Sequence, residues 1–148
     1  MRHRRFSDEG SSSLEFITGG LLLLVPMIYL VLAVSAIQGA ALSIEGAARQ
    51  AARVYVQAPN ESEAMARAQR AVDFGLNDHG IEPGEATVAL TCEPAPASCL
   101  QRLGLVTMRV SVSIALPLVP AILGLNTVAR VPLSAGATQQ VSRFWSGD

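Results

Sequence analysis

Residues 16–37 read FITGGLLLLVPMIYLVLAVSAI, twenty-two residues without a charge. As a helix this segment would rise about 33 Å, which matches the roughly 30 Å hydrocarbon core of a bilayer. Gly19, Gly20 and Pro26 would weaken a helix in water, but membrane spans tolerate such residues where neighbouring groups satisfy the freed backbone atoms. The segment therefore predicts a single membrane-spanning helix.

The arginines on the two sides of this segment predict its orientation. Three of the first five residues are arginine, and the positive-inside rule then places the N-terminus in the cytoplasm and the chain after about residue 45 outside it. Arg49 and Arg53 follow the span and oppose this orientation. Glu45 offsets the charge of Arg49 at i,i+4 spacing. We therefore expect a single-pass protein whose C-terminal part is extracytoplasmic or on the cell surface.

A second uncharged run, residues 110–129, must be weighed as another span. It contains Pro117, Pro120 and Gly124, and the chain around its beginning alternates with period two, which is the pattern of a half-buried strand. We therefore reject the second span and expect a strand. In VTMRVSVSIAL the apolar face comprises Val106, Met108, Val110, Val112, Ile114 and Leu116, and the polar face Thr107, Arg109, Ser111 and Ser113.

The chain after the span continues with helical character. Residues 38–57, QGAALSIEGAARQAARVYVQ, contain no helix breaker before Pro59, so we expect the membrane helix to extend outside the bilayer as one rod. Two interpretations of its small residues stay open: close packing against a neighbouring helix, or merely the high helix propensity of alanine. These glycines and alanines occupy positions 39, 40, 41, 46, 47, 48, 51 and 52.

A second helix is predicted after Asn60. The Asn60 side chain is suited to accept a hydrogen bond from the first turn, and Glu63 stands at the third helical position, as in a capping box. The helix should end between residues 75 and 80, and His79 in NDHG is interpreted as a turn residue without a chemical role. Its expected apolar stripe comprises Met65, Ala68, Gln69, Val72 and Leu76.

Three strands complete the predicted fold. EATVALTC, residues 85–92, alternates; residues 105–116 form the second strand; and residues 127–138 form a weaker third, in which Pro132 indicates an edge. The simplest burial of these stripes is an α+β fold, in which two helices cover the apolar face of a three-stranded antiparallel sheet. The expected inward face of the first strand comprises Ala86, Val88, Leu90 and Cys92.

These elements predict three segments along the chain. Residues 11–37 form the transmembrane helix, 38–58 a helical stalk and 59–148 an extracytoplasmic α+β head.

The two cysteines, Cys92 and Cys99, enclose the short sequence CEPAPASC. The two cysteines do not predict a zinc site, because only His3 and His79 are available to complete four ligands. Outside the cytoplasm the pair predicts a disulfide that closes a proline-containing loop. So short a closure would contribute about 2 kcal/mol in the chain-entropy model.

Composition and motifs argue against several function classes. The chain is 50% hydrophobic but only 5% aromatic, and its net charge is −1, with the eleven basic residues, all arginine, scattered along it. This distribution does not predict nucleic-acid binding. There is no evident Ser/His/Asp set, no pair of acids at a strand end and no phosphate-binding glycine loop, so we expect no enzyme, no cofactor and no small-molecule substrate.

The acid at the start of the apolar segment has a particular position. If the chain were cut after Gly10, Ser11 would be the new N-terminus and Glu15 its fifth residue, followed by Phe16 and the span. This arrangement resembles the class III signal of type IV pilin-like proteins. The whole chain is similar to the TadE family of minor pseudopilins of the Flp, or tight-adherence, pilus. The matching pieces are MRHRRFSDEG, SSSLEF, the single N-terminal span, IEGAARQAARVYVQ, the cysteine pair and the alternating strand.

The resemblance implies a structural role in a pilus or secretion apparatus. A prepilin peptidase would cut after Gly10, remove residues 1–10 as a leader peptide and leave the span attached. The carboxylate of Glu15 would then pair with the α-amino cation of Ser11 on a neighbouring subunit. Each charge would lower the desolvation cost of the other. The partners so implied are other pilin-like subunits, the peptidase, an inner-membrane assembly platform and membrane lipid. The alternative role of Glu15 is an interfacial acid stabilised only by the helix dipole.

Another interpretation of the N-terminus is an ordinary signal peptide. Val34, Ser35 and Ala36 offer small residues after an apolar run, and cleavage there would release a secreted domain beginning at Ile37. The apolar run is longer than the usual ~7–15 residues of a signal peptide, which favours a retained anchor. The mature N-terminus distinguishes these routes, because Ser11 indicates pilin-type processing, Ile37 secretion and Met1 an uncleaved anchor.

Overall fold

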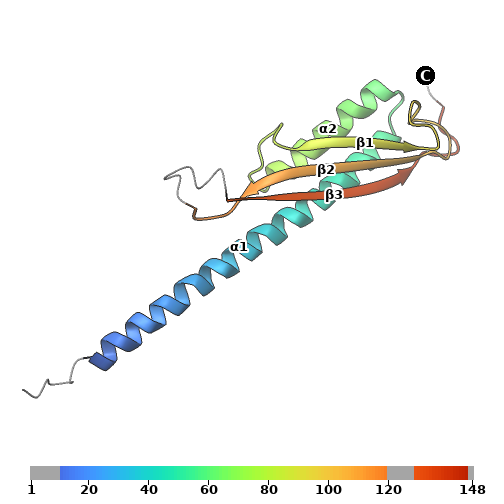
Figure 1. Ribbon diagram of the computed structural model, residues 1–148. Coiled ribbons are helices and arrows are strands. Elements are labelled where there is room, and N and C mark those ends of the chain that lie inside the picture. Colours follow the sequence, from blue (N-terminus) through green and yellow to red (C-terminus); the bar gives the residue numbers. More distant parts are fainter. Residues whose placement is uncertain (1–10, 120–128, 147–148) are drawn as a thin grey trace, which may run out of the picture. The chain divides into compact units, whose positions relative to one another are not determined.

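The structure is a computed structural model that describes residues 11–119 and 129–146, with side chains described from residue 13 onward. It divides into two compact units, Met1–Ser35 and Ala36–Asp148, called unit 1 and unit 2 below. The arrangement is α+β, as predicted (Figure 1). Its elements are α1 (Ser11–Val56), α2 (Glu61–Asn77), β1 (Thr87–Glu93), β2 (Leu105–Ala115) and β3 (Arg130–Gln140).

The described part of unit 1 is the N-terminal portion of α1. All side chains of residues 13–28 are exposed, and Pro26 lies inside the helix without ending it. Among the described residues, α1 is the one helix long and apolar enough to cross a membrane. The sequence-based prediction of a long apolar N-terminal helix is therefore confirmed.

Unit 2 contains a three-stranded antiparallel sheet in the order β1-β2-β3. The alternation predicted for the first two strands is confirmed: Val106, Met108 and Val110 are buried, whereas Leu105 before them and Arg109 between Met108 and Val110 are exposed. In β1 the expected inward residues likewise alternate with exposed ones. The period-two pattern therefore sets the buried face of both strands.

The third strand differs from its predicted bounds. It runs from Arg130 to Gln140 instead of 127–138, and residues 127 and 128 lie outside the described part of the chain. Pro132 pairs with Ser113 and lies on an edge strand, as expected, where its missing N–H removes no ladder bond on the open side.

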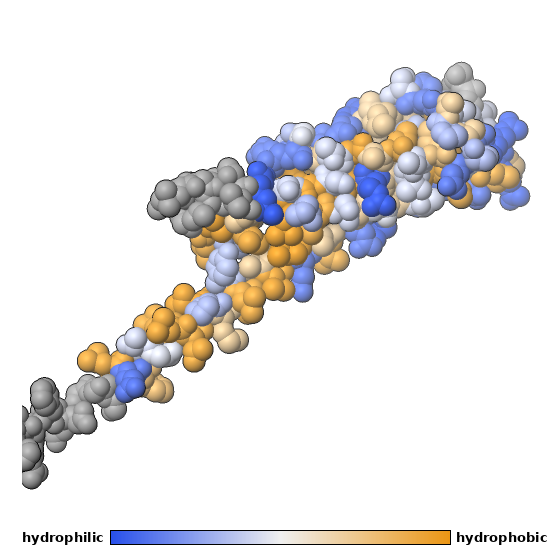
Figure 2. Space-filling model, in the orientation of Figure 1, coloured by the Kyte–Doolittle hydropathy of each residue, from blue (hydrophilic) through white to orange (hydrophobic). Residues whose placement is uncertain are grey.

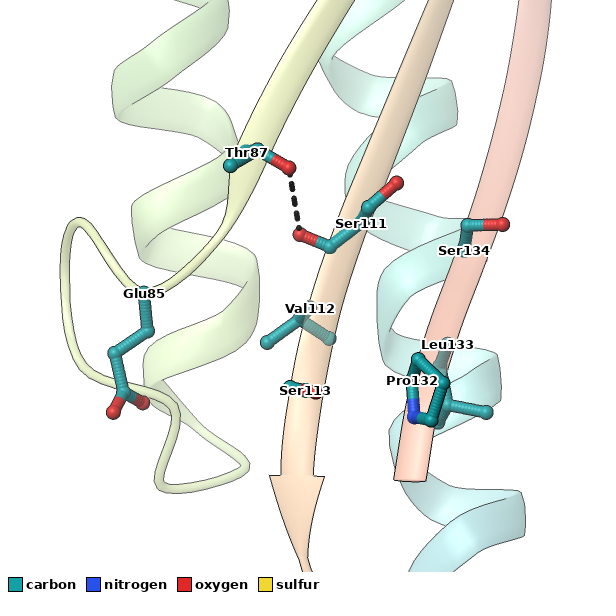
Figure 3. A pocket seen from close by; sticks show the side chains of 8 residues that line it. All are labelled: Glu85, Thr87, Ser111, Val112, Ser113, Pro132, Leu133 and Ser134. Carbon is teal, nitrogen blue, oxygen red and sulfur yellow. Dashed lines mark hydrogen bonds between the residues drawn. The ribbon is translucent and has the colours of Figure 1, made fainter. Parts of the chain in front are cut away.

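Both helices cover the same face of the sheet, as Figures 1 and 3 show. Within unit 2, α1 contributes Ile44 and Tyr55 to the core, and α2 contributes Val72 and Leu76. The α1 residues that we expected to form a stalk thus share a core with the sheet. The alanines of α1 in this core are Ala47, Ala48, Ala51 and Ala52.

The two helices approach closely at Gly75. A Cβ atom placed on Gly75 would lie 3.4 Å from the Cβ of Ala47, and the Ser43 hydroxyl donates a hydrogen bond to the Gly75 carbonyl at 3.1 Å. A side chain larger than alanine at position 75 would meet α1 directly. Of the two interpretations of the small residues, close packing against a neighbouring helix is therefore observed at Ala47, and the neighbour is α2 of the same chain.

Helix α2 begins as predicted, and it buries Ala68, Val72 and Leu76 of the predicted stripe. Asn60 Oδ1 accepts from the Glu63 backbone N–H at 3.0 Å, whereas the Glu63 carboxylate binds Arg67 one turn later instead of completing a capping box. The expected stripe was wrong at Met65, which is 38% exposed, and at Gln69, whose amide donates to Asp73. Ala64, which was not in the predicted stripe, is buried as well. The buried positions are Ala64, Ala68, Val72 and Leu76.

Candidate functional site

The exposed surface of unit 1 is apolar on every side of the helix. Phe16 is 82% exposed, and large aliphatic side chains follow it around the full circumference of α1 as far as Val34. Figure 2 shows the resulting succession of hydrophobic side chains along this segment. A helix that is apolar all round requires apolar surroundings, because water contact with so much aliphatic surface is unfavourable. This part of α1 is compatible with a membrane anchor.

Three of the predicted processing and assembly residues, Ser11, Glu15 and Phe16, lie at the beginning of this helix. Gly10 lies outside the described residues, and Ser11 is the first residue of α1. Glu15 follows one helical turn after Ser11, and both Glu15 and Phe16 are exposed. Ser11 and Glu15 therefore lie on one face of the helix, at the boundary of the apolar surface.

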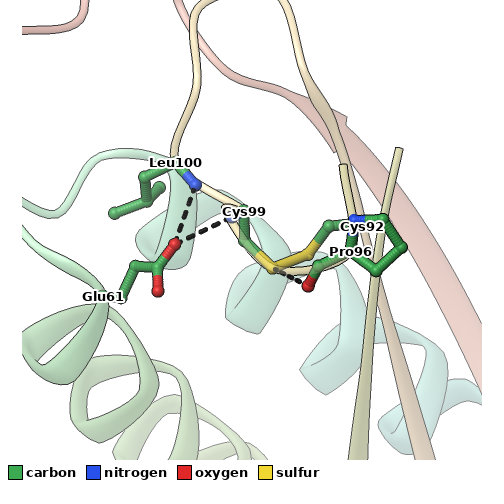
Figure 4. The surroundings of a disulfide bond; sticks show 5 residues. All are labelled: Glu61, Cys92, Pro96, Cys99 and Leu100. Atoms are coloured by element: carbon green, nitrogen blue, oxygen red, sulfur yellow. Dashed lines mark hydrogen bonds between the residues drawn. A yellow bond between two sulfur atoms is a disulfide. The ribbon is translucent and has the colours of Figure 1, made fainter. Parts of the chain in front are cut away.

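The predicted disulfide is present in unit 2. Cys92 and Cys99 are joined and buried, and their bond closes the loop that follows β1. A second contact holds the same loop: the Glu61 carboxylate accepts from the backbone N–H of Cys99 at 2.8 Å and of Leu100 at 3.5 Å (Figure 4). The loop is thus fixed both to β1 and to the first turn of α2.

Sequence reasoning did not identify Glu61. An acid in the first turn of a helix is ordinarily interpreted as a partner of the helix dipole, and nothing local indicates a contact with Cys99, 38 residues away. Glu61 also affects Tyr55, which is buried at the end of α1. Burial raises the pKa of the Tyr55 phenol, and the negative charge of Glu61 raises it further.

The C-terminal segment is attached to the turn between the two helices. The Trp145 indole N–H donates to the Ala58 carbonyl at 2.9 Å, and Arg102 Nε donates to the Trp145 carbonyl at 3.0 Å. This end of unit 2 also carries the disulfide loop, as Figure 1 shows. These contacts are structural: they join segments far apart in the sequence.

A shallow pocket of about 460 Å³ lies on the sheet (Figure 3). Half of its eight lining residues carry a hydroxyl group, and Thr87 Oγ1 donates to the Ser111 carbonyl at 3.3 Å. Among the lining residues Glu85 is the one acid, and it faces Arg130 at 3.9 Å. Hydroxyls without an adjacent base are poor nucleophiles, so we assign no reaction to the pocket. In the described ranges no group of three or more His, Cys, Asp or Glu side chains could hold a metal ion.

Comparison with models of protein families, with curated proteins and with solved structures finds no match for this chain.

Proposed function

We propose that this chain is a minor pseudopilin-like subunit of a Flp-type pilus or secretion apparatus, processed by a prepilin peptidase and assembled through its N-terminal helix. The observation that carries the proposal is the exposed apolar surface that α1 presents from Leu14 to Val34, with the Glu15 carboxylate at its beginning. A membrane anchor requires the apolar surface but does not require an acid beside it. The acid at its boundary, five residues after Gly10, is explained by assembly.

The electrostatic reason is the cost of a lone charge in an apolar layer. A carboxylate next to packed apolar helices loses hydration, and that loss is compensated only by a partner of opposite charge. Cleavage after Gly10 would create such a partner, the α-amino cation of Ser11. When helices of neighbouring subunits pack side by side, the amine of one and the Glu15 carboxylate of the next would fix their relative register.

The head fits a location outside the cytoplasm. Unit 2 contains the Cys92–Cys99 disulfide and a small core rich in alanine. A disulfide persists in an oxidising compartment. In this proposal the N-terminus starts in the cytoplasm, where the peptidase and the inner-membrane assembly platform act. Unit 2 then presents its polar sheet face to other pilin-like subunits or to the surroundings.

The first experiment determines the N-terminus of the protein extracted from membranes. Intact-mass spectrometry should give a chain beginning at Ser11. A mass beginning at Met1 would indicate an uncleaved anchor, and one beginning at Ile37 would indicate ordinary secretion. Either of these two results would contradict pilin-type processing.

The second experiment removes the charge of Glu15. We expect Glu15→Gln to abolish formation of the assembled apparatus while the chain still begins at Ser11 and remains in the membrane. Glu45→Gln is the matched control, because Glu45 is an exposed acid on the same helix that binds Arg49. Normal assembly of the Glu15→Gln protein would refute the proposed role of the carboxylate.

A further inference from the structure

Exposed apolar side chains from two helices lie at one end of unit 2. Leu42 on α1 is 68% exposed and Phe74 on α2 is 79% exposed. The residues that follow them, Ser43 and Gly75, are joined by the 3.1 Å hydrogen bond between the Ser43 hydroxyl and the Gly75 carbonyl. Leu42 and Phe74 are therefore at the same level of the unit.

The connection between β2 and β3 begins at this same end. A cavity of about 280 Å³ is lined jointly by Gly80 and Ile81, which follow α2, and by Ile114, Ala115 and Arg130 at the facing ends of β2 and β3. Figure 1 shows the last turn of α2 and the end of β2 together at this end of unit 2.

Leu118 extends the apolar surface beyond the last paired residues. The Leu116 N–H donates to the Ala129 carbonyl at 3.1 Å, and Leu118, two residues later, is 75% exposed. On the face that Figure 2 shows, hydrophobic side chains gather at the end of unit 2 that holds the first turns of its α1 segment. Residues 116–119, the described residues that follow β2, carry no charge that would oppose contact with lipid.

The position of this end along the chain identifies what covers it. Unit 2 begins at Ala36, and the proposed span ends at residue 37. Ser43 is six residues further on, or about 9 Å of helical rise. The headgroup layer on each side of the hydrocarbon core is about 5–8 Å thick. The Ser43–Gly75 contact therefore falls at the outer limit of the headgroups, within reach of a Phe or Leu side chain.

We propose that this end of unit 2 rests on the bilayer that α1 crosses, with Phe74 and Leu118 inserted into the headgroup layer. The inference rests on the membrane span of the proposed function and does not depend on pilus assembly. Apolar and aromatic side chains are stabilised at this depth, and a second contact would restrict tilting of unit 2 about the single span. Asp78 and Glu82 are exposed near the same end, so the surface suits lipid without net charge better than anionic lipid.

Tryptophan fluorescence tests this contact in the full-length chain. Phe74→Trp and Leu118→Trp are reconstituted separately into phosphatidylcholine vesicles, either plain or brominated at carbons 6 and 7 of one acyl chain. The wild-type chain has one tryptophan, Trp145, whose indole is held by Ala58 at the opposite end of unit 2, and it supplies the background. Both added tryptophans should lose fluorescence in the brominated vesicles, since bromine quenches only on close approach.

Leu103→Trp is the matched control. Leu103 and Leu118 are both exposed leucines with positive φ, 62° and 61°, and they flank opposite ends of β2. Quenching at positions 74 and 118 no greater than at 103 would overturn the proposal. A blue shift at these positions without bromine quenching would also overturn it, because a protein partner would then cover the surface. Failure of the chain to float with vesicles would overturn the span itself, and with it both this inference and the proposed function.

Discussion

A single carboxylate, that of Glu61, connects the first turn of α2 with the disulfide loop. It accepts a hydrogen bond from the Cys99 N–H at 2.8 Å. Such a charge-assisted hydrogen bond contributes more to stability than one between neutral groups. Glu63, two residues later, instead forms an exposed ion pair with Arg67. The two acids share the same helical turn, so the helix dipole acts on both in the same way.

Replacement of these acids should therefore have unequal effects. Glu61→Ala should lower the free energy of unfolding by about 1–2 kcal/mol, because it leaves the Cys99 N–H without its acceptor. Glu63→Ala should cost no more than about 0.5 kcal/mol, the usual worth of an exposed helical ion pair. Urea unfolding in detergent, followed by Trp145 fluorescence, measures both. Equal losses would show that only the helix dipole matters at these positions.

Tyr55 predicts a loss of stability at alkaline pH. Burial, and then the Glu61 charge, raises the pKa of this phenol in the folded chain, whereas in the unfolded chain it titrates near ~10. Below that pH both states hold the proton and this group adds no pH dependence. Above it the unfolded state releases the proton first, so the free energy of unfolding falls as pH rises.

Tyr55→Phe should remove this part of the alkaline decline. Urea midpoints measured by circular dichroism between pH 8 and 11.5 should fall less steeply for the variant than for the wild type. Superimposable slopes for the two chains would contradict the assigned environment of Tyr55.

At the scale of elements, the alanines of α1 within unit 2 have two explanations: close packing against the core, or high helix propensity. Ala51 is fully buried, whereas Gln50, its neighbour in the sequence, is exposed. Leucine has nearly the helix propensity of alanine but a much larger side chain. Substitution by leucine therefore tests packing and leaves propensity almost unchanged.

Ala51→Leu should lower the free energy of unfolding by about 1–3 kcal/mol, because the added atoms must fit between α1 and the rest of the core. Gln50→Leu should change it by less than about 0.5 kcal/mol, as is usual at an exposed site. Urea unfolding with Trp145 as the probe gives both values. Similar values for the two variants would mean that these alanines serve helix propensity alone.

The strands were predictable because the alternation of apolar and polar residues indicates which face of each strand is buried. Val106, Met108 and Val110 could occupy one face only if the segment is extended, and no helix satisfies that spacing. The stripe of α2 was less predictable. Alanine is common on both exposed and buried faces, so Ala64, which is buried, gave a weaker signal than Met65, which is exposed.

The parts of the candidate site were predictable to different degrees. Cys92 and Cys99 could be paired because the chain has two cysteines, and the spacing from Gly10 to Glu15 is a pattern visible in the sequence. Glu61 could not be found in this way. Its partner is 38 residues distant, and the contact exists only because the loop after β1 returns to the start of α2.

At the scale of the whole molecule, the proposed topology depends on the charges that flank the span. The redox state of two cysteines far along the chain reports which side of the membrane unit 2 occupies. Three arginines precede residue 16, and Arg49 and Arg53 follow the span. The positive-inside rule keeps the more basic side in the cytoplasm. The Cys92–Cys99 pair would then reach an oxidising compartment, where its disulfide is stable.

Reversal of the N-terminal charges should therefore change the redox state of the cysteines. In cells alkylated before lysis, wild-type Cys92 and Cys99 should resist modification until a reductant is added. Replacement of the three N-terminal arginines by glutamate leaves Arg49 and Arg53 as the basic flank, so a larger fraction of chains should retain unit 2 in the cytoplasm with reactive thiols. Arg49→Glu with Arg53→Glu is the matched control, since it strengthens the original asymmetry and should keep the cysteines protected. Wild-type cysteines that react without reductant would contradict an extracytoplasmic unit 2, and unchanged protection after N-terminal charge reversal would show that these arginines do not orient the chain.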